Sequence, residues 1–205
     1  MDQREIRAFI TDFETRNEGD NIGVIKGRPI VFNSETNMGW YRETIDIHAL
    51  DNADLKDVRL CLNHDTSFVY ARSRNNNENS TMRIGVDANG LYFEARLDLT
   101  SAKANDLYIA VQRGDLNQMS FMFVVSADEW EDIDSDSPLR IIKEIRTVYE
   151  ISVVTFPAYE ATSVQVASGE NPNALDNVRV SLDNAKAEAR ALERRKQKLR
   201  ILANL

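Results

Sequence analysis

Three side chains of this sequence could together carry out acyl transfer: a serine, a histidine and a carboxylate. Ser120 stands in an apolar run, Met119 to Phe123, that follows a segment with helical periodicity. A serine hydroxyl attacks a carbonyl at neutral pH only when a base takes its proton and a third group orients that base. His64 and Glu150 are the residues that could take these two roles.

Both partners of the serine are expected on β-strands. Residues 58 to 64 alternate between apolar and polar side chains, which predicts a strand with His64 at its end, on the core side. A buried carboxylate needs a hydrogen-bond donor, and an imidazole N–H would supply one. The same alternation puts Glu150 in one row with three other residues: Val148, Ser152 and Val154.

The residues alone leave the third member of this group open. His48 could replace Glu150, and Glu150 could instead form an ion pair with Arg146 on its own strand. Asp65 is adjacent to His64, but neighbouring side chains in an extended chain point apart.

A thiol nucleophile is a further alternative. Cys61 lies three residues before His64, which in a strand puts the two side chains on opposite faces. We therefore expect Cys61 to be a buried apolar residue. With one cysteine and two histidines, the chain is not expected to form an internal disulfide or a closed zinc site, and we predict no cofactor.

Composition narrows the functional class. A chain of 205 residues with 42% hydrophobic content suits one domain with a tail. The net charge of -8 argues against general nucleic-acid binding. No apolar run is long enough to cross a membrane, and the first residues do not resemble a signal peptide, so we predict no membrane association and a cytoplasmic location.

The other elements are predicted from turn and capping signals. We expect a helix over 101–113, capped by Thr100 or Ser101 and ended by Gly114, and a hairpin around 87–90. The acidic run 128–136 is interpreted as an exposed loop, and 141–156 as a strand-rich stretch.

The composition changes near residue 169, which divides the chain into a domain, 1–168, and a tail, 169–205. The tail from Glu170 onward has eight Lys or Arg and five Asp or Glu, so its net charge is +3, whereas the preceding residues carry -11. A heptad-like series of small and apolar residues predicts one amphipathic helix. This helix could pack on its own domain or bind a partner.

The sequence resembles the prohead, or capsid maturation, serine proteases of tailed bacteriophages. The resemblance extends from Ile6 to about Val166, and several motifs occur in the family's order. They are Ile30–Ser34, Leu60–Asp65, Gly90–Ala95, Arg113–Asp115, Met119–Phe123 and Tyr149–Tyr159.

This resemblance implies a function and a fold. It implies a serine endopeptidase with Ser120 as nucleophile, His64 as general base and an acidic third member that Glu150 matches best. The implied fold is mainly β with flanking helices (α+β), similar to the antiparallel β-barrel of herpesvirus assembly proteases. In those enzymes the third member is a second histidine, which keeps His48 as an alternative.

The resemblance also implies partners. Such proteases act inside the immature shell, where they cut the scaffold or the scaffold-like segment of the major capsid protein, and then themselves. The expected partners are therefore the major capsid protein with its scaffold segment, the portal and further copies of this chain. The tail would direct incorporation or be removed by self-cleavage. The rival expectation is a non-catalytic capsid-assembly or scaffolding protein that keeps the protease fold.

Overall fold

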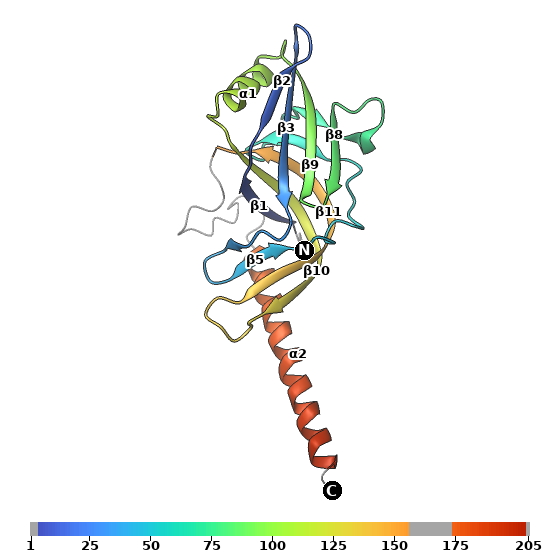
Figure 1. The fold of residues 1–205 in the computed structure, drawn as a ribbon, viewed down its shortest axis with the longest axis vertical. Helices are drawn as coiled ribbons and strands as arrows, with labels where there is room; N and C mark the ends of the chain where they lie inside the picture. The colour runs from blue at the N-terminus through green and yellow to red at the C-terminus, as the bar shows by residue number, and fades with distance from the viewer. Residues whose placement is uncertain (1–3, 156–173, 204–205) are drawn as a thin grey trace.

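The computed structural model describes residues 4–155 and 174–203 as a β-rich body with a long C-terminal helix (Figure 1). The mainly β fold with flanking helices is thus confirmed. No helix within the described ranges is both long and apolar enough to cross a membrane. The predicted boundary at 168/169 lies outside the described residues.

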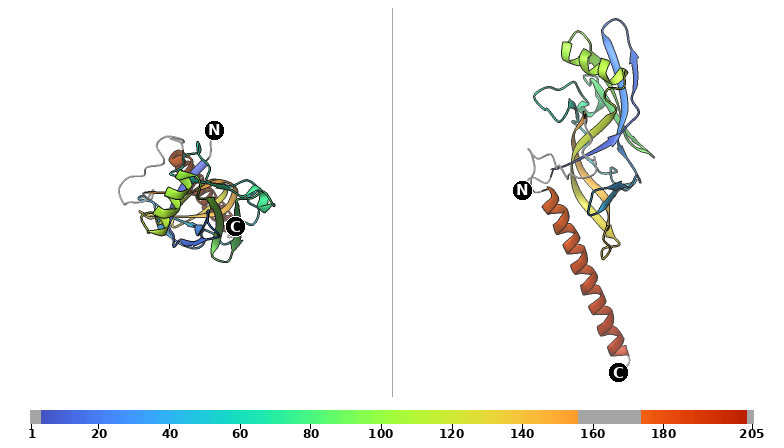
Figure 2. Two further views of the ribbon diagram at one scale, coloured as in Figure 1. Left: turned by 90° about the horizontal axis from the view of Figure 1, so that it is seen from above. Right: turned by 90° about the vertical axis from the view of Figure 1, so that its left-hand side faces the viewer.

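The strands form two sheets (Figure 2). The order in the larger sheet is β1 (Arg4–Ile10), β10 (Gln118–Glu131), β11 (Leu139–Val153), β5 (Arg42–Ile45) and β4 (Thr36–Asn37), while β6 (Arg59–Leu62) and β7 (Ala71–Arg72) continue from the other half of β11. The smaller sheet contains β2 (Glu14–Asn17), β3 (Ile22–Val31), β9 (Gly90–Asp98) and β8 (Met82–Asp87). The described strands do not close into one barrel, so the predicted barrel is not found.

The main hydrophobic core lies where the two sheets meet. It contains Ile25 of β3, Phe93 of β9, and Phe121 and Ile151 of the larger sheet, all at most 1% exposed. Helix α1 (Ala102–Gln112) adds one apolar side to this core. A short 3-10 helix, η1 (Arg74–Asn76), lies in the polar connection before β8.

The predicted helix and hairpin are confirmed. Helix α1 ends at Gln112, and Gly114 just beyond it has a φ of +78°, the left-handed conformation that glycine adopts without strain. Ser101 occupies the N-cap position, but its side chain makes no capping hydrogen bond. Strands β8 and β9 form the predicted hairpin, with Asp87 paired to Gly90.

The acidic run 128–136 was predicted as a loop, and this is wrong for its first half. Residues 128–131 belong to β10 and pair with 139–142 of β11. Trp130 explains the difference: its ring packs against Trp40 and Tyr41, and this apolar contact stabilises an extended chain that charge alone does not predict.

Helix α2 (Ala174–Ala203) docks on the body through residues near its N-terminal end. Val178 is buried beside Met38, Trp40 and Tyr41, and Leu182, one turn further on, is also buried. The hydroxyl of Ser181 accepts a hydrogen bond from Trp130 Nε1 (2.9 Å) and donates one to Asp128 (2.7 Å). The rest of the helix extends away from the sheets (Figure 1). The first turns of the helix thus pack on their own domain, and partner binding by the tail stays a prediction.

A buried cluster of charged side chains joins four strands of the larger sheet. Arg7 of β1 contacts Glu43 of β5 (2.5 Å) and Glu5 (2.6 Å). Arg140 of β11 contacts Glu5 (2.8 Å), Glu43 (3.0 Å) and Asp128 of β10 (2.6 Å). Burial by itself raises the pKa of Glu5, but Arg140 and Arg7 outweigh it and hold that pKa below the usual value. The Glu5 carboxyl group thus stays ionised and paired.

Removing one member of this cluster is expected to destabilise the fold strongly, because its partners stay buried and charged. Arg140→Met should lower the free energy of unfolding by about 3–5 kcal/mol, measured by urea denaturation. The matched control is Arg16→Met, which removes an exposed arginine paired with Glu18 and Glu94 and should change stability little. Equal effects of the two substitutions would contradict this account.

Candidate active site

His64 lies in a turn just beyond β6, not at the end of a continuing strand as predicted. The strand ends at Leu62, and both Asn63 (φ +52°) and His64 (φ +62°) are left-handed. The Asn63 side chain accepts a hydrogen bond from the Thr155 backbone N–H (2.9 Å), which fixes this turn against the end of β11. The alternation of the strand therefore does not decide where the imidazole points.

The imidazole of His64 contacts the carboxylate of Glu150. The distance from Nδ1 to Oε1 is 2.7 Å, and Glu150 is 2% exposed while the His64 side chain is 18% exposed. Glu150 bonds with His64, whereas the Arg146 side chain is exposed. The alternative prediction of an Arg146–Glu150 ion pair is therefore wrong. The buried carboxylate has the imidazole partner that its burial requires.

A β-bulge determines which way Glu150 points. The β10–β11 register shifts between Met122, opposite Glu150, and Phe123, opposite Val148. Val148 belongs to the main core together with Ile151, so it does not share a row with Glu150 as predicted. The extra residue at the bulge reverses the alternation there. Glu150 and Ser152 thereby lie on the other face of the sheet.

Ser120 lies near the start of β10, directly opposite Ser152 on β11 and Ala8 on β1. Directly opposed residues of antiparallel strands point to the same face, with Cβ atoms about 4.5–5.5 Å apart. The Ser120 hydroxyl therefore lies on the face that carries Glu150. It is 1% exposed, and its Oγ donates a hydrogen bond to the Arg7 carbonyl (2.8 Å).

Three adjacent strands thus bring together the predicted serine, histidine and carboxylate. Strand β11 lies between β10 and β6 and supplies Glu150. The serine is on the first neighbour and the histidine follows the second. The Ser120 hydroxyl donates its hydrogen bond to the Arg7 carbonyl in this structure, not to His64.

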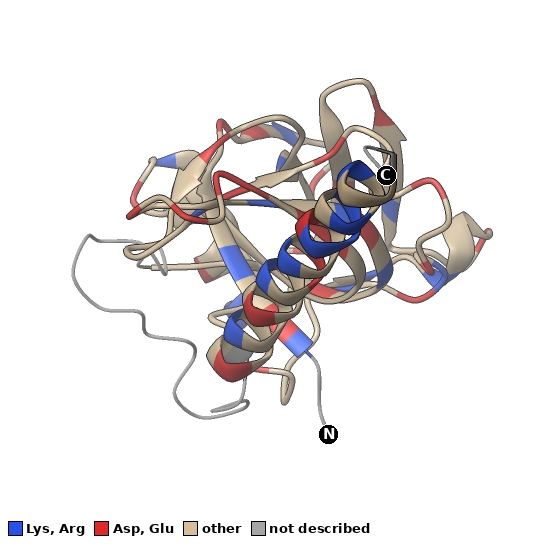
Figure 3. Cartoon of the chain, turned by 90° about the horizontal axis from the view of Figure 1, so that it is seen from below, with Lys and Arg blue, Asp and Glu red and all other residues tan. Residues whose placement is uncertain are grey.

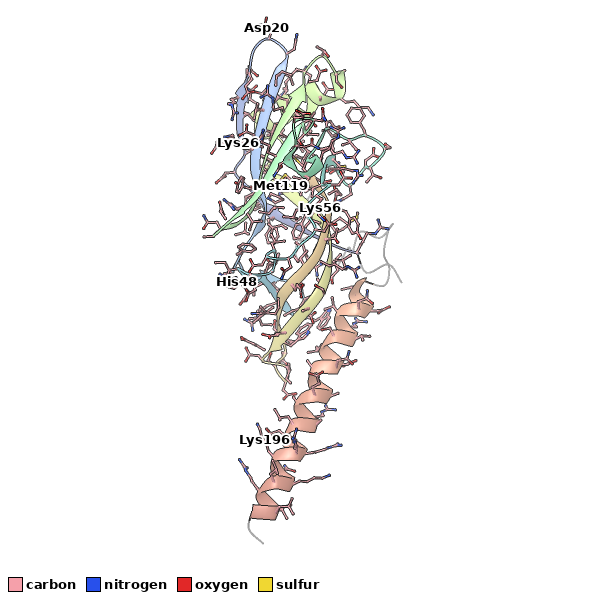
Figure 4. The ribbon with its side chains drawn as sticks, turned by 90° about the vertical axis from the view of Figure 1, so that its right-hand side faces the viewer. Asp20, Lys26, His48, Lys56, Met119 and Lys196 are labelled. Carbon is pink, nitrogen blue, oxygen red and sulfur yellow. The ribbon has the colours of Figure 1, made fainter. Side chains whose placement is uncertain are left out.

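His48 and Asp65 lie outside this group. The His48 side chain is 76% exposed, and its Nδ1 lies 3.1 Å from Asp51 in the same surface turn. Figure 4 labels His48 well below Met119, the neighbour of Ser120. Asp65 is exposed, and hydrogen bonds from Ser67 hold its pKa below the usual value. Neither side chain contacts the imidazole of His64.

Ser152 is a member of this group to which the sequence analysis assigned no role. Its hydroxyl donates to Glu150 Oε2 (2.5 Å) and accepts from the His64 backbone N–H (3.1 Å). Its position two residues after Glu150 could have indicated a shared face, but the link to the His64 backbone depends on the turn at Asn63.

Cys61 is buried, as predicted, and lies beside Ser152 in the parallel pairing of β6 with β11. Burial and the nearby Glu150 carboxylate raise the pKa of its thiol from 9.0 to about 12. The reactive form of cysteine is the thiolate. At neutral pH this residue therefore remains a thiol and does not suit the role of nucleophile.

We expect Cys61 of the native protein to be almost inert to iodoacetamide at pH 8. Three units of pKa correspond to roughly a thousandfold less thiolate, and burial slows the reaction further. Mass spectrometry should show one added group only after denaturation. Fast labelling of the folded protein would mean that Cys61 is accessible and ionised, contrary to this geometry.

Comparison with known proteins identifies the family of this chain. The model of the caudovirus prohead serine protease family matches residues 11–176, most of the chain. A prohead protease of Enterobacteria phage HK97 is 29% identical over 160 residues, which are 77% of this chain and 64% of the relative's length. No solved structure matches. The chain belongs to the caudovirus prohead serine protease family.

Proposed function

We propose that this protein is a serine endopeptidase of phage prohead maturation that acts through Ser120, His64 and Glu150. The observation that carries the proposal is the 2.7 Å contact between His64 Nδ1 and Glu150, on the sheet face that holds Ser120. Membership of the family supports it. No metal or cofactor takes part in the proposed reaction.

Each residue has a defined role in the reaction. Glu150 accepts a hydrogen bond from the Nδ1–H of His64. Nε2 of the same ring is then unprotonated and can act as the base. Nε2 takes the proton of Ser120 as Oγ attacks the peptide carbonyl, and the Glu150 carboxylate stabilises the imidazolium that forms. His64 then protonates the leaving amine. Water then attacks the acyl-enzyme. His64 takes the proton of that water and returns it to Ser120 Oγ, which leaves.

The geometry favours Glu150 over His48 as the third member. Glu150 is buried and within hydrogen-bond distance of His64, whereas His48 is exposed and pairs with Asp51. A triad of the herpesvirus kind would need His48 to reach the imidazole of His64. The relationship to herpesvirus assembly proteases, including their closed barrel, stays a prediction.

The proposed substrate is the scaffold or scaffold-like segment of the major capsid protein, followed by the chain itself. The HK97 relative is named a prohead protease, and the resemblance to the family implies this substrate. We place the protein inside that shell in the host cytoplasm, with the portal and other copies of the chain as further contacts.

We further propose that the distal part of α2 pairs with a helical scaffold segment. Leu192, Leu199 and Leu202 lie on one side of the helix and are each more than half exposed, although the same helix buries Val178 and Leu182 nearer the body. Lys and Arg gather toward the C-terminal end of the helix (Figure 3). An apolar stripe bordered by basic residues suits an acidic amphipathic helix as partner.

Substitution of the three residues should give a graded loss of cleavage. Ser120→Ala should abolish cleavage of capsid protein and of the chain itself without unfolding it. Glu150→Gln should lower the rate by roughly two to four decades, about 3–5 kcal/mol of activation free energy, because the imidazolium loses its charged partner. His48→Ala should be far milder.

Gel assays of capsid-protein cleavage, with fluorophosphonate labelling of the serine, check this series. Cleavage by purified Ser120→Ala would refute the assignment. A greater loss for His48→Ala than for Glu150→Gln would indicate a triad of the herpesvirus type. A wild-type chain that neither labels nor cleaves within assembled proheads would instead indicate a non-catalytic assembly protein.

Deletion of residues 186–205 should reduce incorporation into proheads several-fold and leave the body folded, because Val178, Ser181 and Leu182 remain docked. Quantitative mass spectrometry of proheads, in a Ser120→Ala background that prevents self-cleavage, measures the incorporated amount. A control with the exposed substitution Arg83→Ala, on β8 of the body, should be incorporated normally. Normal incorporation of the deletion variant would contradict the proposed role of α2.

A further inference from the structure

Ser152 links the main chain of His64 to the carboxylate that binds the His64 ring. It is fully buried, with 0% exposure. Its hydroxyl donates to Glu150 Oε2 (2.5 Å) and accepts from the His64 backbone N–H (3.1 Å). Glu150 Oε1 in turn bonds with His64 Nδ1 (2.7 Å). One hydroxyl thus closes a ring of hydrogen bonds through a single histidine.

The backbone of His64 needs such a support. Asn63 and His64 both have positive φ, a conformation that costs free energy in residues other than glycine. The Asn63 side chain holds the turn from one side through Thr155, and the Ser152 hydroxyl holds it from the other through the His64 N–H. Both contacts lead to β11 or to the residues just after it.

The same hydroxyl also fixes the carboxylate. A buried carboxylate with one donor on each oxygen cannot rotate without breaking a bond, and a hydroxyl bond to a charged oxygen is among the stronger hydrogen bonds in proteins. With Oε2 occupied by Ser152, Oε1 stays directed at the imidazole.

Ser152 itself does not suit the role of nucleophile. Its proton is directed to Glu150, and its oxygen accepts from the His64 backbone. Attack on a substrate would require both bonds to break. Ser120 lies on the neighbouring strand. Within the described residues, its hydroxyl makes one hydrogen bond, to the Arg7 carbonyl.

We infer that Ser152 is a positioning residue that sets the geometry of the His64–Glu150 pair by bonding to the backbone of one and the carboxylate of the other. The inference rests on the proposed function for its effect on rate, but its effect on the geometry of His64 does not depend on proteolysis.

The first test is NMR spectroscopy of the full chain with Ser120→Ala, which prevents cleavage. His48→Gln leaves His64 as the only histidine, so the Nδ1–H signal is assigned directly. We expect a Nδ1–H proton far downfield of the amide signals. Adding Ser152→Ala should shift it upfield or broaden it beyond detection and should speed hydrogen exchange at the His64 amide.

Two further variants separate positioning from packing. Ser152→Thr keeps the hydroxyl and should retain the downfield signal. Ser152→Cys keeps the shape but offers only a weak donor, so it should resemble Ser152→Ala. In the active chain, Ser152→Ala and Ser152→Cys should lower kcat about a hundredfold with little change in KM, because small displacements of catalytic groups have effects of this size. Ser152→Thr should recover most of the rate.

Two results would overturn the inference. One is that the Nδ1–H signal and the hydrogen exchange of the His64 amide stay unchanged in both Ser152→Ala and Ser152→Cys. The other is that the loss of rate equals the loss of folded protein measured by thermal unfolding. A failed proposed function gives a different pattern: Ser120→Ala would still cleave, or wild type would not, while the Ser152 variants would still change the His64 signals.

Discussion

The antiparallel pairing of β10 and β11 is the constraint on which the rest of the structure depends. These strands have 14 and 15 residues and lie at the centre of the larger sheet. One end of the pair holds Ser120 opposite Ser152, and the other holds Asp128 and Trp130, on which α2 docks. The register of one ladder therefore fixes both the candidate site and the place of the helix.

Irregularities in this ladder matter as much as its regular part. An unbroken alternation would have placed Val148 and Glu150 on one face, which would leave either an apolar side chain outside the core or a carboxylate within it. The bulge between them allows Val148 to join the core while Glu150 meets His64. Polar groups that are nearly fully buried thereby obtain partners, as burial demands.

Strand β1 connects the buried charge cluster to Ser120 through one residue, Arg7. The Arg7 side chain belongs to the buried charge cluster with Glu43 and Glu5, and the carbonyl of the same residue accepts the hydrogen bond of Ser120. The cluster holds β1 against β10 and β11 by interactions that are strong only because every charge is paired. The position of β1, and with it the surroundings of the serine, follows from that pairing.

The sequence by itself determined the residue types, the helix at 101–113, the hairpin at 87–90 and the family, since these depend on local periodicity, turn residues and motif order. It also singled out Ser120, His64 and Glu150, but it left open Arg146 as a partner for Glu150 and His48 as the third member. Only the tertiary structure paired Glu150 with His64, because that contact depends on a bulge in β11 and a left-handed turn after β6. The role of Ser152 was beyond the sequence for the same reason: its two partners are 2 and 88 residues away, and only strand pairing brings them together.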